Sequence, residues 1–168
     1  SGSVMKHTWK QGVSKIPAKL DDYAYLGQAL LQHASASGEN KWIVKADELM
    51  EVIVNEFISE EGFFYYTPRG QKDIPVRKVD TNDGALPSAN AIMAQNLWIC
   101  GMCMEKGEWV EKSIKRLIQM SDTINRYSYS FGCWSVLQQR HVEVNRMIIC
   151  SGNEAENLHH HRSEEHTS

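Results

Sequence analysis

Asn82-Asp83-Gly84-Ala85-Leu86-Pro87-Ser88-Ala89-Asn90 runs directly into the most apolar segment of the chain, residues 91–104. Asp83-Gly84 is a turn dipeptide, Pro87 disfavours a helical residue before it, and Ser88 is a good N-cap. The pattern predicts a loop followed by a helix over 88–104 that is buried all round. Asp83, Ser88 and Asn90 would gather at the helix N-terminus, where they either meet a ligand or simply cap the helix.

Two helices are expected before this stretch. Apolar residues from Tyr23 to Ala34 recur at helical spacing and predict a helix over 22–37, with Asp21 or Asp22 as its N-cap. Residues 37–40 break it. A second amphipathic pattern from Trp42 to Phe57 predicts a helix that returns antiparallel to the first. The two form one helical hairpin.

A second helical hairpin is expected after the loop. A break at Lys106-Gly107 separates the apolar helix from a fourth helix over 108–120. Its apolar residues are expected on one side and its charged residues on the other. A fifth helix over 130–141 would start a third pair. The apolar set is Trp109, Val110, Ile114, Leu117 and Ile118, and the charged set is Glu111, Lys112, Lys115 and Arg116.

Short extended segments flank the helices. Residues 7–16 alternate weakly around Gln11-Gly12, which predicts a short β-hairpin. Residues 62–67 are rich in β-formers, and a second extended run over 74–79 could pair with them. Residues 147–150, followed by Ser151-Gly152, indicate a C-terminal strand.

The helix pattern predicts an α/α array with an inner and an outer layer, because in each hairpin an apolar helix precedes an amphipathic one. Asp21-Asp22 and Asp83 each precede the first helix of a pair. In such an array both loops would open at the same end. The fold class is therefore all-α dominated, with short β-hairpin insertions and a C-terminal strand.

Composition narrows the function classes. The 168 residues are 42% hydrophobic and 23% charged, with a net charge of −3, which is ordinary for one globular domain. Lys and Arg are scattered, so no nucleic-acid surface is indicated. No apolar run reaches the length of a membrane span, and the first residues given do not show a signal-peptide pattern, so we expect a cytoplasmic location by default.

The four cysteines carry no sign of redox or metal chemistry. Cys100, Cys103, Cys133 and Cys150 lie in apolar surroundings without the spacing of a disulfide scaffold. Cys100 and Cys103 form a literal C-x-x-C, but late in a helix and without the strand-to-helix context of a thioredoxin motif. We expect buried thiols, no metal and no cofactor.

Both ends of the chain indicate a fragment. It starts at Ser1 rather than Met, and a strand is expected to be under way by His7. Residues 162–168 read like the translation of a sequencing-adapter oligonucleotide. We therefore expect one partial domain over 1–152 and a disordered tail over 153–168.

The chain resembles a known family at several motifs. They are His7-Thr8-Trp9-Lys10, Lys15-Ile16-Pro17, Leu20-Asp21-Asp22-Tyr23-Ala24 and Asp83-Gly84-Ala85-Leu86-Pro87-Ser88-Ala89-Asn90. They are similar to the C-terminal region of YyaL-type and spermatogenesis-associated thioredoxin-like proteins. The resemblance covers residues 7–152, with Ala89 where the family usually has Gly. It implies a partial (α/α)6 toroid of the six-hairpin glycosidase type, and in the full-length protein an N-terminal thioredoxin-like domain.

The resemblance also implies an association with carbohydrate metabolism, but no particular reaction. Glycoside chemistry needs two carboxyl groups facing one sugar, which makes Asp22 and Asp83 the candidate catalytic residues. Asp21, Tyr23, Asn90 and Trp9 are the candidate ligand-binding residues. Helix capping and core packing are the alternative explanations of the same residues.

Two functions of different class follow. One is a carbohydrate-active or sugar-binding toroid, with catalysis left open, and the other is a non-catalytic helical protein-interaction module. If the two Asp loops converge on one open, aromatic-lined mouth, the first is favoured. If Asp22 and Asp83 are both used up in capping, the second is favoured.

Overall fold

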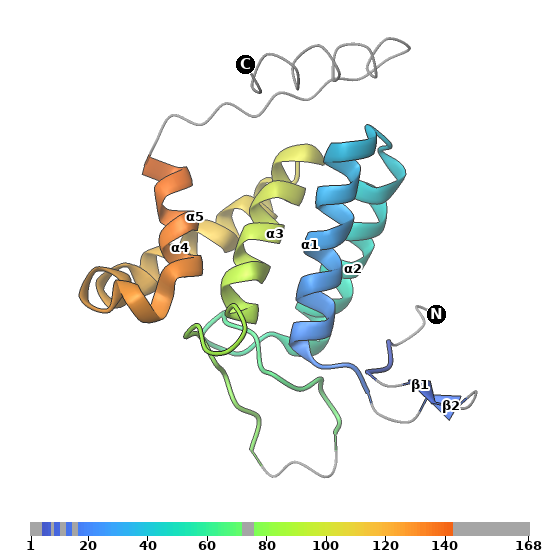
Figure 1. Ribbon diagram of the computed structural model, residues 1–168, viewed down its shortest axis with the longest axis horizontal. Helices are drawn as coiled ribbons and strands as arrows, with labels where there is room; N and C mark the ends of the chain where they lie inside the picture. Colours follow the sequence, from blue (N-terminus) through green and yellow to red (C-terminus); the bar gives the residue numbers. More distant parts are fainter. Residues whose placement is uncertain (1–4, 8, 11–12, 15–16, 72–75, 143–168) are drawn as a thin grey trace.

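The computed structural model describes residues 5–7, 9–10, 13–14, 17–71 and 76–142 (Figure 1). Within them, five α-helices, one short 3-10 helix and one two-stranded hairpin follow each other along the chain. They are β1 (Trp9–Lys10), β2 (Val13–Ser14), α1 (Leu20–Ser37), α2 (Lys41–Phe57), α3 (Ala89–Cys103), α4 (Gly107–Arg126), η1 (Ser128–Phe131) and α5 (Gly132–Val142).

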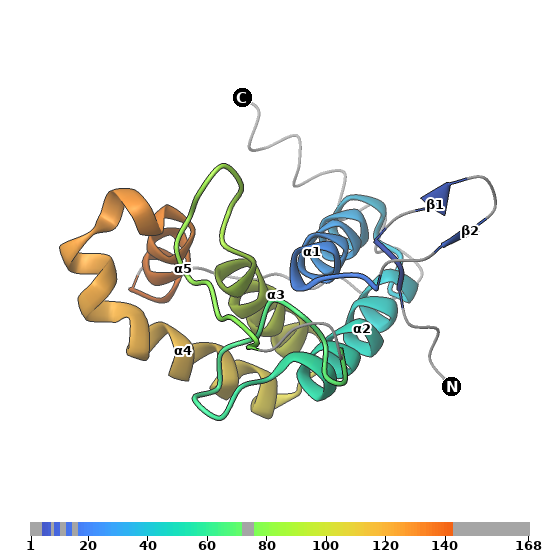
Figure 2. The same cartoon turned by 90° about the horizontal axis from the view of Figure 1, so that it is seen from below.

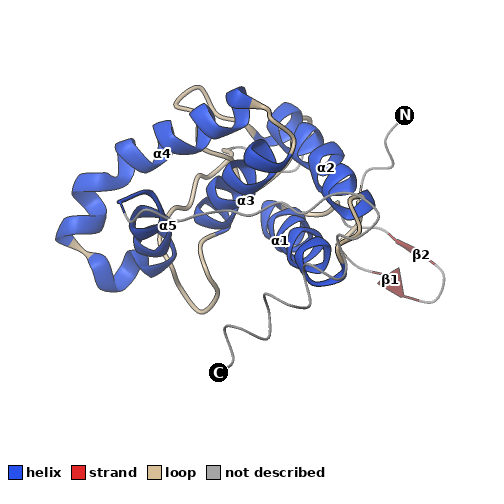
Figure 3. Ribbon diagram, turned by 90° about the horizontal axis from the view of Figure 1, so that it is seen from above, coloured by secondary structure: helices blue, strands red, loops and turns tan. Residues whose placement is uncertain are grey.

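The helices lie in two layers, as the hairpin pattern predicts. α1, α3 and α5 stand side by side in one layer, where α3 contacts both of its neighbours. α2 packs behind α1 and α3, and α4 packs behind α3 and α5 (Figures 2 and 3). The three helices of the first layer begin at the same end of the molecule, the lower end in Figure 1. This common end gathers the loops before α1, α3 and α5.

α3 is the central helix and is buried on all sides of its first turns, as predicted. Every residue from 90 to 97 is buried. Ser88 is the N-cap, and its hydroxyl accepts the Ala91 N–H at 3.3 Å. Met93 and Leu97 join the core of the first hairpin with Phe57, while Ala91 and Ala94 join the core around Trp134. One uncharged helix thus supplies both hydrophobic clusters.

The start of α1 differs from the prediction. The helix begins at Leu20 with Lys19 as N-cap, so Asp21 and Asp22 lie inside its first turn rather than before it. In the first turn, the two carboxylates still interact favourably with the positive end of the helix dipole. The Asp22 carboxylate also accepts the Lys19 N–H at 2.9 Å, which closes the helix end from within.

α4 is amphipathic but rotated from the predicted orientation. Ile114 and Ile118 are exposed, whereas Arg116, expected in water, has only 2% of its surface exposed. The buried positions run through Trp109, Ser113, Arg116, Leu117, Met120 and Ile124. The Arg116 guanidinium lies 4.7 Å from the centre of the Phe64 ring, and burial lowers its pKa to about 10. A cation–π contact therefore occupies a position that the charge pattern assigned to solvent.

The extended segments are shorter than expected. β1 and β2 pair antiparallel, which confirms the first hairpin. Among the described residues, the hairpin expected over 62–67 and 74–79 reduces to one isolated bridge between Tyr65 and Val79. Residues 72–75, the strand expected over 147–150 and the tail over 153–168 lie outside the described residues.

A polar cluster joins α2 to the opposite end of α3. The Asp47 carboxylate, 8% exposed, accepts hydrogen bonds from the Lys106 ammonium at 2.6 Å and from the Trp109 indole at 3.0 Å. Glu51 binds the same ammonium at 3.0 Å. The hydrogen bonds to Asp47 and Glu51 raise the pKa of Lys106. The cluster satisfies a buried charge where the α3–α4 turn meets α2.

In the described part of the chain, no helix has the length and hydropathy needed to cross a bilayer.

Candidate functional site

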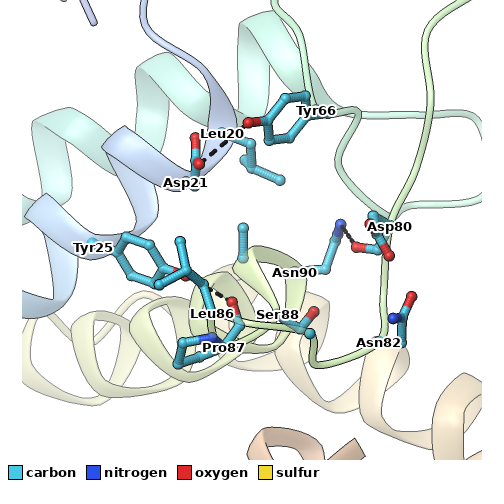
Figure 4. A pocket seen from close by; sticks show the side chains of 12 residues that line it. Leu20, Asp21, Tyr25, Tyr66, Asp80, Asn82, Leu86, Pro87, Ser88 and Asn90 are labelled. Atoms are coloured by element: carbon cyan, nitrogen blue, oxygen red, sulfur yellow. Dashed lines mark hydrogen bonds between the residues drawn. The ribbon is translucent and has the colours of Figure 1, made fainter. Parts of the chain in front are cut away.

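A pocket of about 170 Å³ lies where the N-terminal ends of α1 and α3 meet (Figure 4). α1 supplies one wall, the segment at Tyr66 another, and the loop before α3 the floor. The lining residues are Leu20, Asp21, Tyr25, Tyr66, Asp80, Asn82, Gly84, Leu86, Pro87, Ser88, Ala89 and Asn90. The two Asp loops of the sequence therefore do converge on one opening, and two tyrosines line it.

Asp21 faces this pocket from the first turn of α1. Its carboxylate accepts the Asp22 N–H at 3.0 Å and the Tyr66 hydroxyl at 3.3 Å. Burial, and then the charge of Asp21, raise the pKa of Tyr66. The Lys19 ammonium lies 5.1 Å from the centre of the Tyr66 ring. Each Asp21 oxygen keeps acceptor capacity for a further donor.

Tyr25 joins the two sides of the pocket. It lies one turn after Asp21 on α1, and its hydroxyl donates to the Pro87 carbonyl at 2.7 Å. Burial, followed by the charge of Asp21, raises the pKa of this phenol, so it stays a neutral donor. The ring is held between the helix and the loop before α3. It gives the pocket a fixed aromatic wall.

Asp22, a candidate catalytic residue, does not line this pocket. Its two oxygens lie 2.9 and 2.7 Å from Nδ1 of His7. One of them also accepts the Lys19 N–H. Asp22 thus fastens the N-terminal segment to α1. Sequence reasoning quoted His7 within a motif but did not predict this pair, since fifteen residues separate the partners.

Asp83, the other candidate catalytic residue, lies behind the pocket floor. One carboxylate oxygen accepts the Ser88 N–H at 2.8 Å, and the other accepts the Cys133 N–H at 2.9 Å. Burial, followed by a hydrogen bond to Asp83, raises the pKa of the Cys133 thiol to about 11. Asp83 therefore joins the N-terminal ends of α3 and α5.

Asn90, a candidate ligand-binding residue, is 1% exposed at the pocket floor. Its Oδ1 accepts the Phe64 N–H at 2.8 Å. Its Nδ2 donates to the carbonyls of Phe64 at 3.0 Å and Asp80 at 2.8 Å. Both amide hydrogens are therefore used within the protein, and the side chain holds two loop segments against α3. Figure 4 shows its bond to Asp80.

Tyr23 and Trp9 complete the set of predicted ligand-binding residues. Tyr23 is 3% exposed, its hydroxyl accepts the Met5 N–H at 3.1 Å, and its ring meets Phe57 edge to face. It lines a second pocket of about 390 Å³ with Lys6, Glu56 and Arg69, on another side of α1. Trp9 lies in β1, and its side chain is outside the described part.

Sequence reasoning did not select Tyr25, Tyr66 and Asp80 for the site, and all three line the pocket. Asp80 lies two positions before the turn stretch, and its exposed carboxylate has no hydrogen-bond or ion-pair partner in the described part of the chain. Tyr66 lies in the run over 62–67 that is rich in β-formers, so the pattern predicts a strand residue there rather than a pocket residue. A signal existed in principle, since Asp80, Asn82 and Asp83 form a polar cluster before the apolar helix.

Metal and thiol chemistry find little support in the described part of the chain. There, no group of three or more His, Cys, Asp or Glu side chains could hold a metal ion. Cys100, Cys103 and Cys133 are free thiols. Burial, followed by the charge of Asp47, raises the pKa of Cys100 to about 12, and burial also raises that of Cys103. Such thiols are poor nucleophiles.

Sequence comparison finds relatives but no matching family profile. The chain is 34% identical over 116 residues to an uncharacterised protein of Caenorhabditis elegans, covering 69% of this chain and 16% of that protein. It is 29% identical over 140 residues to spermatogenesis-associated protein 20 of Rattus norvegicus, and 27% identical over 139 residues to the Homo sapiens protein, each time covering 81% of this chain and 18% of the relative. The chain spans less than a fifth of the length of these relatives. It is a distant homologue of spermatogenesis-associated protein 20 and corresponds to a small part of it.

Proposed function

We propose that this chain is part of an (α/α)6 toroid in a longer protein, and that the pocket between α1 and α3 binds a carbohydrate. Parallel first-layer helices backed by antiparallel second-layer helices support the toroid. The homology supports a longer protein, in which a thioredoxin-like domain would accompany the toroid. A cytoplasmic location stays a prediction.

One observation carries the carbohydrate proposal. The loops before α1 and α3 converge on a single opening with a carboxylate, Asp21, and two tyrosines, Tyr25 and Tyr66, in its walls. A sugar ring presents hydroxyl donors at its edges and C–H groups on its faces. Carboxylate oxygens match the first, and aromatic faces match the second. The pocket volume suits a single small ring better than an extended chain.

Catalysis is a separate step of the proposal. The acid/base roles of Asp22 and Asp83 stay predictions. In the structure both carboxylates hold local partners, His7 for one and the starts of α3 and α5 for the other. The same observation favours the second candidate function, a non-catalytic interaction module.

The test of sugar binding compares two tyrosine variants of the intact protein. A panel of neutral and charged monosaccharides is screened by saturation-transfer NMR, and the best ligand is titrated. We expect Tyr25→Leu to weaken binding about tenfold, which corresponds to about 1.4 kcal/mol of lost contact. Tyr129→Leu is the matched control because Tyr129 is 100% exposed on η1. Circular dichroism checks that Tyr25→Leu is folded.

Two results would count against the proposal. If no sugar binds the wild type, or if both tyrosine variants bind like the wild type, the pocket is not a sugar site. Turnover of the bound sugar by the wild type, compared with Asp22→Asn and Asp83→Asn, then decides between an enzyme and a binding module. Equal turnover in all three would remove both aspartates as catalysts.

A further inference from the structure

The charged groups of the pocket are all of one sign. Asp21 lines one wall and Asp80 the opposite side, and no Lys, Arg or His is among the lining residues (Figure 4). The ammonium of Lys19 is near, but it lies over the Tyr66 ring, and Lys19 does not line the pocket. Among the described residues, a ligand in the pocket therefore meets two carboxylates and no side-chain cation.

The N-terminal ends of α1 and α3 attract anions, but this attraction is weaker than the repulsion from the two carboxylates. α1 and α3 both begin at the pocket, and each N-terminus carries about half a positive charge from its helix dipole. Two full negative charges outweigh two such half charges. In addition, Asp83 already accepts the Ser88 N–H at the start of α3, which uses part of that positive end. The described groups that line the pocket are therefore negative on balance, which disfavours an anionic ligand.

The aromatic lining adds to the preference for a cation. The faces of tyrosine rings carry negative partial charge, which attracts ammonium groups within about 6 Å. Tyr25 and Tyr66 both line the pocket. Their hydroxyl hydrogens are already donated to the Pro87 carbonyl and to Asp21, so their oxygens face a ligand as acceptors. Two carboxylates and two tyrosines are a set suited to a protonated amine carried on a small polar ring.

Resting on the proposed function, we propose that the ligand of this pocket is a sugar with a free protonated amine, and that phosphorylated and acidic sugars are excluded. Asp21 binds the ammonium from the α1 side and Asp80 from the loop before α3. The tyrosines and the backbone around Pro87 contact the ring. The two carboxylates thereby determine specificity within a site that also admits neutral sugars more weakly.

The experiment compares three ligands that differ in one substituent. D-glucosamine, D-glucose and D-glucose 6-phosphate are titrated into the intact protein at pH 6.5 and followed by NMR chemical shifts. We expect glucosamine to bind at least tenfold more tightly than glucose, and glucose 6-phosphate to bind more weakly than glucose. Raising the salt concentration should reduce the advantage of glucosamine, because exposed charges are screened beyond about 8 Å at 0.15 M.

Charge-neutral variants assign the effect to the two carboxylates. Asp21→Asn and Asp80→Asn should each lower glucosamine affinity severalfold and change glucose affinity less than threefold. Asp80→Asn is the safer variant for folding because Asp80 holds Asn90 through its backbone carbonyl. Asp122→Asn, which removes the same charge from the exposed side of α4, should change neither affinity.

The outcomes separate this inference from the carbohydrate proposal. Equal binding of glucose and glucosamine, or binding of glucose 6-phosphate at least as tight as that of glucose, overturns the amine preference but leaves a sugar site. An amine preference that persists in both folded Asp variants overturns the assignment to these carboxylates. If none of the three ligands binds and the wider sugar panel is also negative, the carbohydrate proposal itself is wrong.

Discussion

Both carboxylate oxygens of Asp83 accept backbone N–H groups, one from Ser88 and one from Cys133. Fifty residues separate Asp83 from the second of these donors. The side chain therefore does more than cap one helix, because it fixes the spacing between the starts of α3 and α5. The Asp83 N–H also donates to the Ser130 carbonyl at 2.8 Å, which closes a ring of contacts between the two segments.

Asp83→Asn should lower the free energy of unfolding by about 1.5–3 kcal/mol, the usual range for hydrogen bonds to a charged group. The amide keeps one acceptor oxygen, but its NH2 group then faces a backbone N–H that has lost its partner. Urea unfolding followed by circular dichroism measures the loss. Asp122→Asn on the exposed side of α4 is the control and should stay within about 0.5 kcal/mol of the wild type. An equal midpoint for both variants would show that the bridge contributes nothing.

At the scale of the elements, α3 packs tightly against the start of α4 at Gly101. A Cβ atom at Gly101 would lie 2.8 Å from Cγ2 of Val110, 2.9 Å from Cβ of Trp109 and 3.0 Å from the Lys106 carbonyl oxygen. None of these atoms is the free end of a flexible side chain. The Lys106 N–H donates to the Gly101 carbonyl at 2.9 Å, so the turn is anchored at the same point. The absence of a side chain at Gly101 lets the turn close.

Gly101→Ala should therefore destabilise the protein although alanine favours helices. Overpacking costs about 1–3 kcal/mol, and the gain in helix propensity returns about 1 kcal/mol at most. The matched control is Gly107→Ala at the first residue of α4, where a Cβ would meet nothing within 4 Å. Thermal unfolding of the two variants checks the difference. A Gly101→Ala melting temperature at or above that of Gly107→Ala would contradict the packing argument.

At the scale of the whole molecule, the two layers bury several weak acids in neutral form. The pKa of Cys100 is raised to about 12 and that of Cys133 to about 11, from 9.0, while those of Tyr23, Tyr25 and Tyr66 are raised above 10.0. Burial is the largest cause in each case. An acid that ionises more readily after unfolding makes its full contribution to stability below its unfolded pKa, and this contribution is lost as the pH rises toward its folded pKa. The fold should therefore weaken at alkaline pH.

Cys100 gives this expectation a specific test. Its contribution is complete below pH 9 and is lost as the pH rises toward 12, by up to about 1.4 kcal/mol per pH unit. The stability of the wild type should fall more steeply between pH 8.5 and 10.5 than that of Cys100→Ala, which has no thiol to ionise. Urea midpoints across this range measure both slopes. Met102→Ala, on the exposed side of α3, should follow the wild-type slope; parallel slopes for all three would refute the argument.

The two-layered arrangement could be predicted because its signals are local. Ser88 is an N-cap by its position, and the uncharged run after it predicts a helix buried on all sides. The orientation of α4 could not be predicted in the same way. Arg116 is buried because the Phe64 ring, 52 positions away, receives its guanidinium, and no pattern within α4 contains that information. A prediction from charge pattern assumes that charged side chains face water. The assumption fails for Arg116 because the aromatic ring of Phe64 contacts its guanidinium in place of water.

The sequence predicts the position of the candidate site better than it predicts the residues that line it. The convergence of the Asp21 and Asp83 loops followed from the repeat of loop and helix. The direction of each carboxylate did not, since it depends on His7 for Asp22 and on the start of α5 for Asp83. Tyr66 reaches Asp21 from 45 positions away. Helix starts locate a site, whereas tertiary contacts decide which of its side chains face the ligand.

The hydrogen bonds of Asn90 have a consequence for how homologues of this chain can vary in length. The Asn90 side chain hydrogen-bonds to both the N–H and the carbonyl of Phe64, as a neighbouring strand would. It also donates to the carbonyl of Asp80. Phe64 and Asp80, at the two ends of the intervening segment, are thus both hydrogen-bonded to Asn90. The segment is a closed loop, and lengthening a closed loop costs little, about 0.6 kcal/mol per doubling. Insertions between residues 71 and 76 should therefore be tolerated without moving the pocket walls. A single residue gained or lost between 81 and 89 should not.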